Sequence, residues 1–255
     1  MNVDVAFSPR DLAPGEVAGR TVIVVDVLRA TTCICAALDR GARAVIAVAE
    51  IDEAARLGEA LGTDSAILAG ERNSVRIPGF QLGNSPLEMT AENVRGRTVI
   101  MTTTNGTPAL LAANGAREVL IGAAVNLTAI GAHARRALDE RGELLVLCAG
   151  RQHGFGLDDA YIAGCLAVLA LGGSRRRKGL NDAALAAVDL VSRYRRRVER
   201  VLALSRAGRE LTRLGFRDDV IAAAAVDAHP VLPILHDRRI TIAGPLALTI
   251  EHRRG

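Results

Sequence analysis

The sequence predicts an α/β fold: a three-layer α/β/α arrangement with a mixed, largely parallel sheet and an internal pseudo-repeat. Short Val- and Ile-rich runs alternate with Ala- and Leu-rich segments of helical length, as expected of strands that helices cover on both faces. Residues 20–46 and 97–121 also repeat one pattern, which runs from RTVI through a polar loop and an Ala/Leu segment to Gly-Ala-Arg. We interpret each copy as strand, loop, helix and strand.

The expected elements follow from this alternation. Strands are predicted at residues 3–7, 21–27, 44–49, 66–69, 98–103, 118–122, 143–148 and 239–250. Helices are predicted at residues 32–40, 52–61, 108–114, 127–140 and 158–171. Gly41 and Gly115 suit the residue that follows a helix, and Asn126 suits an N-cap. Residues 180–227 are expected to be almost entirely helical, with breaks near Gly208 and Gly215.

Composition narrows the class of protein. A hydrophobic content of 49% with 24% charged residues indicates a globular chain, and no linker separates two domains. We therefore expect a single domain over residues 1–255, with pseudo-repeat halves of roughly 1–95 and 96–255. Aromatic residues make up only 2%, which disfavours the base-stacking surfaces of single-strand nucleic-acid binders.

Charge, cysteine spacing and targeting signals indicate the class of protein less strongly than the composition does. The net charge of +4 comes mainly from arginine runs, which form either a solvated face or an anion-attracting surface. The four cysteines match no zinc spacing and lie in apolar contexts, so a reduced, cytoplasmic protein is expected. We find no signal peptide, and the longest apolar stretch, residues 161–171, is too short to span a bilayer.

The polar loop of the first copy carries the first candidate site. Asp26 ends the apolar run VIVVDV, where a carboxylate is costly to bury unless it binds a metal or a donor. Arg29 and Thr31 follow, so a carboxylate for Mg²⁺, a guanidinium and a hydroxyl for phosphoryl oxygens come together. The alternative is structural: a local Asp26–Arg29 ion pair with Thr31 as a helix cap.

The second copy offers an uncharged loop, TTTNGTP at residues 102–108. Its Thr104, Asn105 and Gly106 precede a helix, whose free amides and dipole favour an anion. The alternative is an ordinary Asn-Gly turn capped by Thr107, with Pro108 at the first helical position.

A third group of polar residues lies between the two copies. Glu71 and Arg72 follow a short apolar strand, and we interpret them as a metal carboxylate and an anion ligand. Asn84 and Ser85 precede Pro86, which could open a helix. The alternative for all four is a surface loop with a capped helix start.

The last candidates follow the strand ELLVLC. Cys148 at its end is either a nucleophile with a lowered pKa or a small buried thiol. Asp158 and Asp159 open a helix, where the dipole alone would favour them, but with Asp26 and Glu71 they would also make an all-oxygen site for a hard cation. His153, between them and Cys148, is the histidine expected nearest to a site.

Together these motifs resemble the 2-phosphosulfolactate phosphatase family. The resemblance rests on VDVLRATT (25–32), GER (70–72), GFQLGNSP (79–86), TTTNGT (102–107), CAG (148–150), LDDAYIAG (157–164) and the segment 205–235, in this order along the chain. It implies an α/β fold with repeated halves and a Mg²⁺-dependent phosphatase that converts 2-phospho-3-sulfolactate to 3-sulfolactate and phosphate in coenzyme M biosynthesis.

The resemblance and the chemistry give each candidate an expected role. We expect the catalytic residues to be Asp26, Cys148 and Asp159, and the metal ligands to be Asp26, Glu71, Asp158 and Asp159. The substrate-binding residues are expected to be Arg29, Thr31, Arg72, Asn84, Ser85, Thr104, Asn105 and Gly106. The nucleophile is either a metal-bound water or a side chain, with Asp26 and Cys148 as the candidates.

Other functions remain open at this point. The chain could act on another small phosphorylated hydroxyacid, or it could bind a phospholigand without turnover. The expected partner is a small phosphorylated acid, with no nucleic acid and no membrane, and a homodimer is left open. If the two repeated loops share one site, Asp26 and Asn105 should face one cleft.

Overall fold

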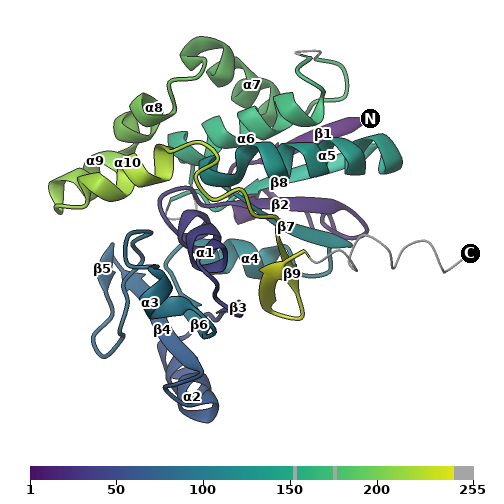
Figure 1. Ribbon diagram of the computed structural model, residues 1–255. Helices are drawn as coiled ribbons and strands as arrows, with labels where there is room; N and C mark the ends of the chain where they lie inside the picture. Colours follow the sequence, from purple (N-terminus) through teal and green to yellow (C-terminus); the bar gives the residue numbers. More distant parts are fainter. Residues whose placement is uncertain (152–153, 175–176, 244–255) are drawn as a thin grey trace, which may run out of the picture.

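The computed structural model describes residues 1–151, 154–174 and 177–243, and its strands form one ten-stranded sheet (Figure 1). The strand order is β1-β8-β2-β7-β9-β10-β3-β6-β4-β5. The strands are β1 (Asn2–Ala6), β2 (Thr21–Val25), β3 (Ala44–Ala47), β4 (Ala66–Arg72), β5 (Val75–Arg76), β6 (Thr98–Thr102), β7 (Glu118–Gly122), β8 (Glu143–Cys148), β9 (Pro233–His236) and β10 (Arg239–Ile242).

Helices fill the connections, and most of them lie where the sequence places them. They are α1 (Ala30–Asp39), α2 (Ile51–Leu61), α3 (Ala91–Val94), α4 (Gly106–Ala112), α5 (Leu127–Arg141), α6 (Leu157–Ala170), α7 (Asp182–Tyr194), α8 (Val198–Leu204), α9 (Arg206–Arg213) and α10 (Arg217–Ala224), with short 3-10 turns η1 (Pro9–Asp11) and η2 (Ala124–Asn126). The predicted α/β class with a mixed, largely parallel sheet is confirmed.

The sheet consists of two parallel blocks joined by a hairpin. Strands β1, β8, β2 and β7 run parallel to one another, and so do β3, β6 and β4. The β9–β10 hairpin lies between them, with β9 antiparallel to β7 and β10 antiparallel to β3. Three successive antiparallel pairings therefore make the two blocks run in opposite directions.

The repeat seen in the sequence exchanges strands between the blocks. Its first copy is β2–α1–β3 and its second is β6–α4–β7, and each copy places its first strand in one block and its second in the other. Thr21 of β2 pairs with Glu118 of β7, and Thr98 of β6 pairs with Ala44 of β3. These four residues occupy equivalent places in the two copies, so the register also repeats.

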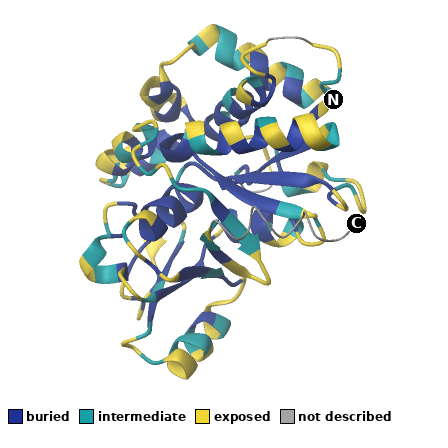
Figure 2. Cartoon of the chain, turned by 45° about the vertical axis from the view of Figure 1, so that its right-hand side comes forward, coloured by how far each residue is buried: buried dark blue, intermediate teal, exposed yellow. Residues whose placement is uncertain are grey.

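The central strands are buried along their whole length because helices cover both faces (Figure 2), and successive residues pack in different core clusters. On β2, Ile23 and Val25 pack in the cluster that holds α5, α6 and α7. Val22 and Val24 belong instead to a cluster that holds α1, α4 and strands of both blocks. Helices α1 and α4 therefore pack side by side on the same face of the sheet, against strands of both blocks. This packing brings their N-termini together.

Several predicted boundaries need correction. The strand predicted at 66–69 continues through Glu71 to Arg72, and the predicted helix start at Pro86 is absent, since residues 86–88 form a turn. The break expected near Gly208 lies at Ser205, whose hydroxyl accepts the Gly208 N–H and caps α9. The last strand ends at Ile242, and the rest of the predicted strand falls outside the described residues.

Three calls on helix ends have mixed outcomes. Gly41 and Gly115 follow α1 and α4 with positive φ angles, as predicted. Asn126 takes the N-cap position of α5, but its side chain bonds to Ala123 and to Ile121 rather than to the helix. No helix in the described ranges has the length and apolarity to cross a membrane.

Candidate active site

Asp26 is buried where β2 meets α1, and the loop is folded around it. Its Oδ1 accepts the Ala30 N–H at 3.3 Å. The Thr31 hydroxyl accepts the Asp26 N–H at 3.1 Å and donates to the Asp26 carbonyl at 2.8 Å. Thr31 therefore holds the backbone of Asp26 in place, whereas the structural alternative expected it to cap the helix.

Arg29 is buried and bonded to the C-terminal helices. Its Nη1 donates to Asp219 Oδ2 of α10 at 2.5 Å, its Nη2 donates to the Ser74 carbonyl at 2.9 Å, and its guanidinium lies 4.7 Å from the Phe216 ring centre. Ser85 Oγ donates to the other Asp219 oxygen at 2.6 Å. The expected local Asp26–Arg29 ion pair is replaced by this Arg29–Asp219 pair.

The β6–α4 loop repeats the arrangement of the β2–α1 loop without charge. Thr103 Oγ1 accepts the Thr107 N–H at 3.0 Å, and Thr107 Oγ1 accepts the Thr103 N–H at 3.1 Å. A Cβ at Gly106 would lie 2.8 Å from Asp26 Oδ2 and 2.5 Å from Ala30 Cβ. The two loops therefore meet at one place, as a shared site would require, although Asp26 itself is buried.

Glu71 joins a short hairpin to the second loop. Asn73 and Ser74 both have positive φ angles and form the two-residue turn between β4 and β5. Glu71 Oε2 accepts the Ser74 N–H at 2.7 Å, and Oε1 accepts the Thr104 N–H at 2.8 Å. Arg72 donates to Thr102 Oγ1 and to two carbonyls, so its guanidinium is also engaged within the protein.

The first turn of α6 supplies two more buried carboxylates. Asp159 accepts the Val27 N–H at 2.8 Å through Oδ1 and the Gly150 N–H at 3.0 Å through Oδ2. It thus ties the segment after β2 to the segment after β8. Asp158 is buried beside it, and the nearby Ser205 hydroxyl opposes the rise in its pKa.

Burial raises the pKa values of Asp26, Asp158 and Asp159, and neighbouring carboxylates raise those of Asp26 and Asp159 further. Desolvation, followed by the charges of Asp158 and Glu71, raises the pKa of Asp26 to about 7, although Ala30 N–H and Arg29 oppose the shift. Desolvation raises the pKa of Asp158 to about 6, against the opposing effects of backbone amides and Arg151. Asp159 has a pKa well above its usual range because of burial and then its neighbours Asp158 and Asp26. The site is an acidic centre that favours bound protons or a cation.

Cys148 belongs to the core and not to this centre's reactive surface. It is fully buried in the cluster around β8 and α6. Burial and the charges of Asp159 and Asp158 raise the pKa of its thiol well above the usual range. Since the thiolate is the nucleophilic form, this environment argues against Cys148 as the nucleophile and favours the buried-thiol alternative.

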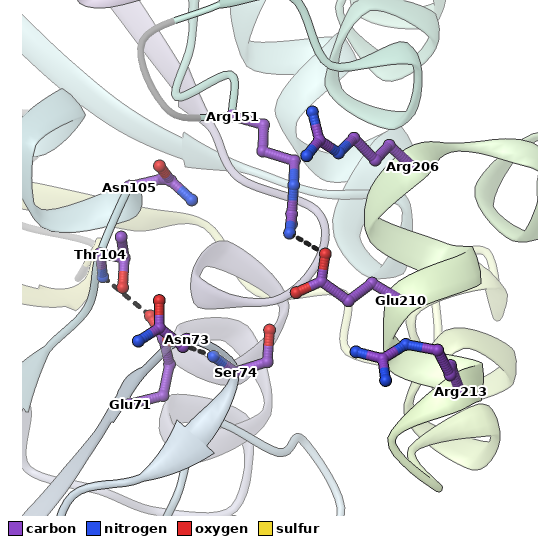
Figure 3. A pocket seen from close by; sticks show the side chains of 9 residues that line it. All are labelled: Glu71, Asn73, Ser74, Thr104, Asn105, Arg151, Arg206, Glu210 and Arg213. Atoms are coloured by element: carbon purple, nitrogen blue, oxygen red, sulfur yellow. Dashed lines mark hydrogen bonds and ion pairs between the residues drawn. The ribbon is translucent and has the colours of Figure 1, made fainter.

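A cavity of about 270 Å³ opens beside the acidic centre (Figure 3). Its lining consists of Glu71, Asn73, Ser74, Thr104, Asn105, Arg151, Arg206, Glu210 and Arg213. Two of these residues act on the buried carboxylates: Glu71 raises the pKa of Asp26, and Arg151 opposes the rise at Asp158. The cavity therefore adjoins the centre, and the second repeated loop borders it through Thr104 and Asn105.

The carboxylates do not form a ready coordination shell. Within the described ranges, no group of three or more His, Cys, Asp and Glu side chains is arranged to hold a metal ion. Glu71 and Asp159 have both oxygens bonded to backbone N–H groups, whereas Asp26 receives only the Ala30 N–H. Asp26, with Asp158 next to it, is thus the best carboxylate for a cation such as Mg²⁺, which commonly takes one or two protein carboxylates and retains water.

The sequence did not single out several residues of the site. They are Asp219, Arg151, Arg206, Glu210 and Arg213. All but Arg151 lie in a helical segment 36 to 49 residues beyond the end of α6, and only the packing of α9 and α10 against the site reveals them. Asn84 lies beside Ser85, and its buried Oδ1 has no hydrogen-bond partner in the described part of the chain. His153 falls outside the described residues.

The fold and the site together define an α/β protein with an acidic centre and an adjoining cationic cavity, an arrangement suited to an enzyme that acts on small anions. A sequence model of the 2-phosphosulpholactate phosphatase family matches residues 6–238, and the chain belongs to this family.

Named relatives agree with the family match. The chain is 39% identical over 228 residues to a probable 2-phosphosulfolactate phosphatase of Symbiobacterium thermophilum, covering 89% of this chain and 96% of the relative. It is 37% identical to one of Caldanaerobacter subterraneus, with 85% and 88% covered. A relative of the same name from Deinococcus radiodurans is 39% identical, with 88% and 91% covered.

Proposed function

We propose that this chain is a Mg²⁺-dependent phosphatase that hydrolyses 2-phospho-3-sulfolactate to 3-sulfolactate and phosphate, in the cytoplasm and in coenzyme M biosynthesis. The observation that carries the proposal is the buried acidic centre of Asp26 and Asp158 next to a cavity with three arginines. A phosphate monoester and a divalent cation together complement this pattern of charge. The choice of 2-phospho-3-sulfolactate as the substrate rests on membership in the phosphatase family.

Asp26 is the residue we propose at the reacting phosphorus. It follows the end of β2, accepts one hydrogen bond among the described residues, from the Ala30 N–H, and touches the loop of the second copy through Gly106. Mg²⁺ held by Asp26 and Asp158 would offset their mutual repulsion and polarise a phosphoryl oxygen. The nucleophile is then either a water molecule or the carboxylate of Asp26.

The uncharged loop is proposed to bind the phosphate. Thr104 and Asn105 line the cavity at the N-terminus of α4, and Gly106 lets this turn approach Asp26. Ser85 donates to Asp219 of α10, and Asn84 precedes Ser85 with a buried Oδ1 that no described group meets. Arg29, Thr31 and Arg72 are bonded inside the protein, so we assign them to holding the site in shape.

Two rival functions remain distinguishable. A phosphatase for another small phosphorylated hydroxyacid would use the same centre with a different preference. A protein that only binds a phospholigand is disfavoured, because uncompensated carboxylates would repel a phosphate.

The test is phosphate release by the purified chain from a panel of phosphorylated hydroxyacids, with Mg²⁺ or with a chelator. We expect release from 2-phospho-3-sulfolactate that needs the metal and exceeds release from the other esters. Equal rates with chelator would contradict the metal requirement. A stronger preference for another ester would favour the first rival, and binding without any release would favour the second.

A further inference from the structure

The cavity has two unlike walls. One consists of Glu71, Thr104 and Asn105 from the strand ends, and the other consists largely of helix α9, as Figure 3 shows. Arg206, Glu210 and Arg213 are spaced by four and three residues, which places them on one face of the helix.

We propose that Arg206 and Arg213, assisted by Arg151, bind the second acidic group of the substrate, its sulfonate, and thereby select phosphoesters that carry one. The proposal rests on the proposed function. It assigns specificity to the C-terminal helices and leaves the chemistry to the strand ends.

The charges lining the cavity support a ligand anion on the α9 wall. The two carboxylates are already engaged: Glu71 by two backbone N–H groups, and Glu210 by Arg151. Within the described residues, no carboxylate pairs with Arg206 or Arg213. The Nε of Arg151 is buried and also lacks a hydrogen-bond partner there. Two unpaired guanidinium groups and one unmet donor therefore border the same cavity.

The phosphate is expected to lie at the opposite wall, so the α9 arginines are available to bind another group of the substrate. A phosphate must lie close to Asp26, and Asp26 meets the Thr104–Gly106 turn rather than α9. Arg72, which sequence reasoning assigned to anion binding, is bonded to Thr102 and to two carbonyls. The arginines of α9 are therefore the cations of this cavity that are still available.

The α9 wall is fixed to the acidic centre. Ser205 caps α9 through the Gly208 N–H and lies near enough to Asp158 to oppose the rise in its pKa. Asp219 of α10 bonds to Arg29 and Ser85. These links set the spacing between the two walls. The site should therefore prefer substrates whose phosphate and sulfonate are separated by a matching distance.

The test compares two substrates that differ only in the sulfonate: 2-phospho-3-sulfolactate and 2-phospholactate. In Arg206→Gln and Arg213→Gln we expect kcat/KM for the sulfonated ester to fall about 10- to 100-fold each, the usual effect of losing a charge-assisted hydrogen bond. For 2-phospholactate the fall should stay within about threefold. Arg209→Gln is the matched control, because Arg209 lies on the same helix but outside this cavity.

Equal losses on both substrates would overturn the proposal, because they would assign the arginines to the phosphate, to the carboxylate that both esters carry, or to folding. Unchanged rates on both substrates would overturn it as well. Calorimetric binding of the product 3-sulfolactate, compared with lactate, gives a readout without turnover, and the two variants should weaken only the former. If the unmodified chain hydrolyses neither ester, the proposed function fails, and this binding comparison still decides whether the α9 wall recognises a sulfonate.

Discussion

The β2–α1 and β6–α4 loops have similar internal hydrogen bonds and different chemistry. In both, the residue after the strand accepts the N–H of the residue four positions on, Ala30 in one and Thr107 in the other. In both, its own N–H donates to a threonine hydroxyl, Thr31 or Thr107. The accepting residue is Asp26 in the first loop and Thr103 in the second. One backbone arrangement thus places a carboxylate on one side of the site and neutral donors on the other.

The largest expected effect comes from removing the charge of the first loop. Asp26→Asn keeps the side-chain shape but removes the carboxylate proposed to act on the phosphorus, and we expect kcat to fall by about 10²- to 10³-fold or more. Phosphate release from 2-phospho-3-sulfolactate measures it. Cys148→Ser serves as the comparison, and it should keep most of the activity because the thiol is proposed to be structural. An active Asp26→Asn variant would refute the assignment of Asp26.

The second prediction concerns a contact that only the first loop makes. Asp219→Ala leaves Arg29 buried without its partner, and breaking a buried ion pair in this way costs about 3–5 kcal/mol. Urea unfolding of the parent chain and of Asp219→Ala measures the difference in the free energy of unfolding. Asp218→Ala, at the exposed neighbouring position on α10, is the control and should change stability little. Equal, small effects of the two variants would mean that the pair does not anchor α10.

The third prediction brings the two loops into conflict. Gly106→Ala places a methyl group 2.5 Å from Ala30 Cβ and 2.8 Å from Asp26 Oδ2, so the loops must separate. Overpacking of this kind costs about 1–3 kcal/mol, and displacement of Asp26 should lower kcat as well. Adding Ala30→Gly removes one of the two clashes and should recover part of the stability. Full activity in Gly106→Ala would show that the loops are farther apart than described.

The smallest predicted effect is a pH dependence carried by Asp26. Its pKa is raised to about 7 in the fold from a usual value of 3.8, so the folded state binds more protons than the unfolded state between these values. Stability contributed by this group is therefore present at low pH and lost as pH rises toward 7. Without metal, the advantage of Asp26→Asn over the parent should grow by about 1–2 kcal/mol between pH 5 and 7. Chemical denaturation at several pH values measures it. A difference that stays constant with pH would contradict the raised pKa.

Sequence reasoning predicted the parts of the fold that have a regular pattern. The apolar strands and the two repeated loops were readable because burial on both faces and helix starts leave local signatures in composition. The β5 and β9 strands were missed, because one has two residues and the other begins at Pro233, a residue that usually marks an edge or an irregular segment.

The site was less readable for a physical reason. Asp26 and Glu71 could be chosen because a carboxylate at a strand end is costly without a partner. Asp219 and Arg213 carry no such signal, since acidic and basic residues on a helix usually face solvent. Asp219 and Arg213 matter because the fold brings them close to the site, which their positions in the sequence do not reveal. Thr31 shows the converse: its hydroxyl suits a phosphate, but it holds the backbone of Asp26 instead.

The exchange of strands between the two copies has a consequence for dividing the chain. Within residues 1–95, only β4 and β5 pair with each other, while β1, β2 and β3 find their partners in the second half. Fragments cut between residues 95 and 96 should therefore be unfolded or aggregated alone, and should regain structure when mixed. In this chain the repeated halves therefore depend on each other for folding, because each supplies strands with which the other must pair.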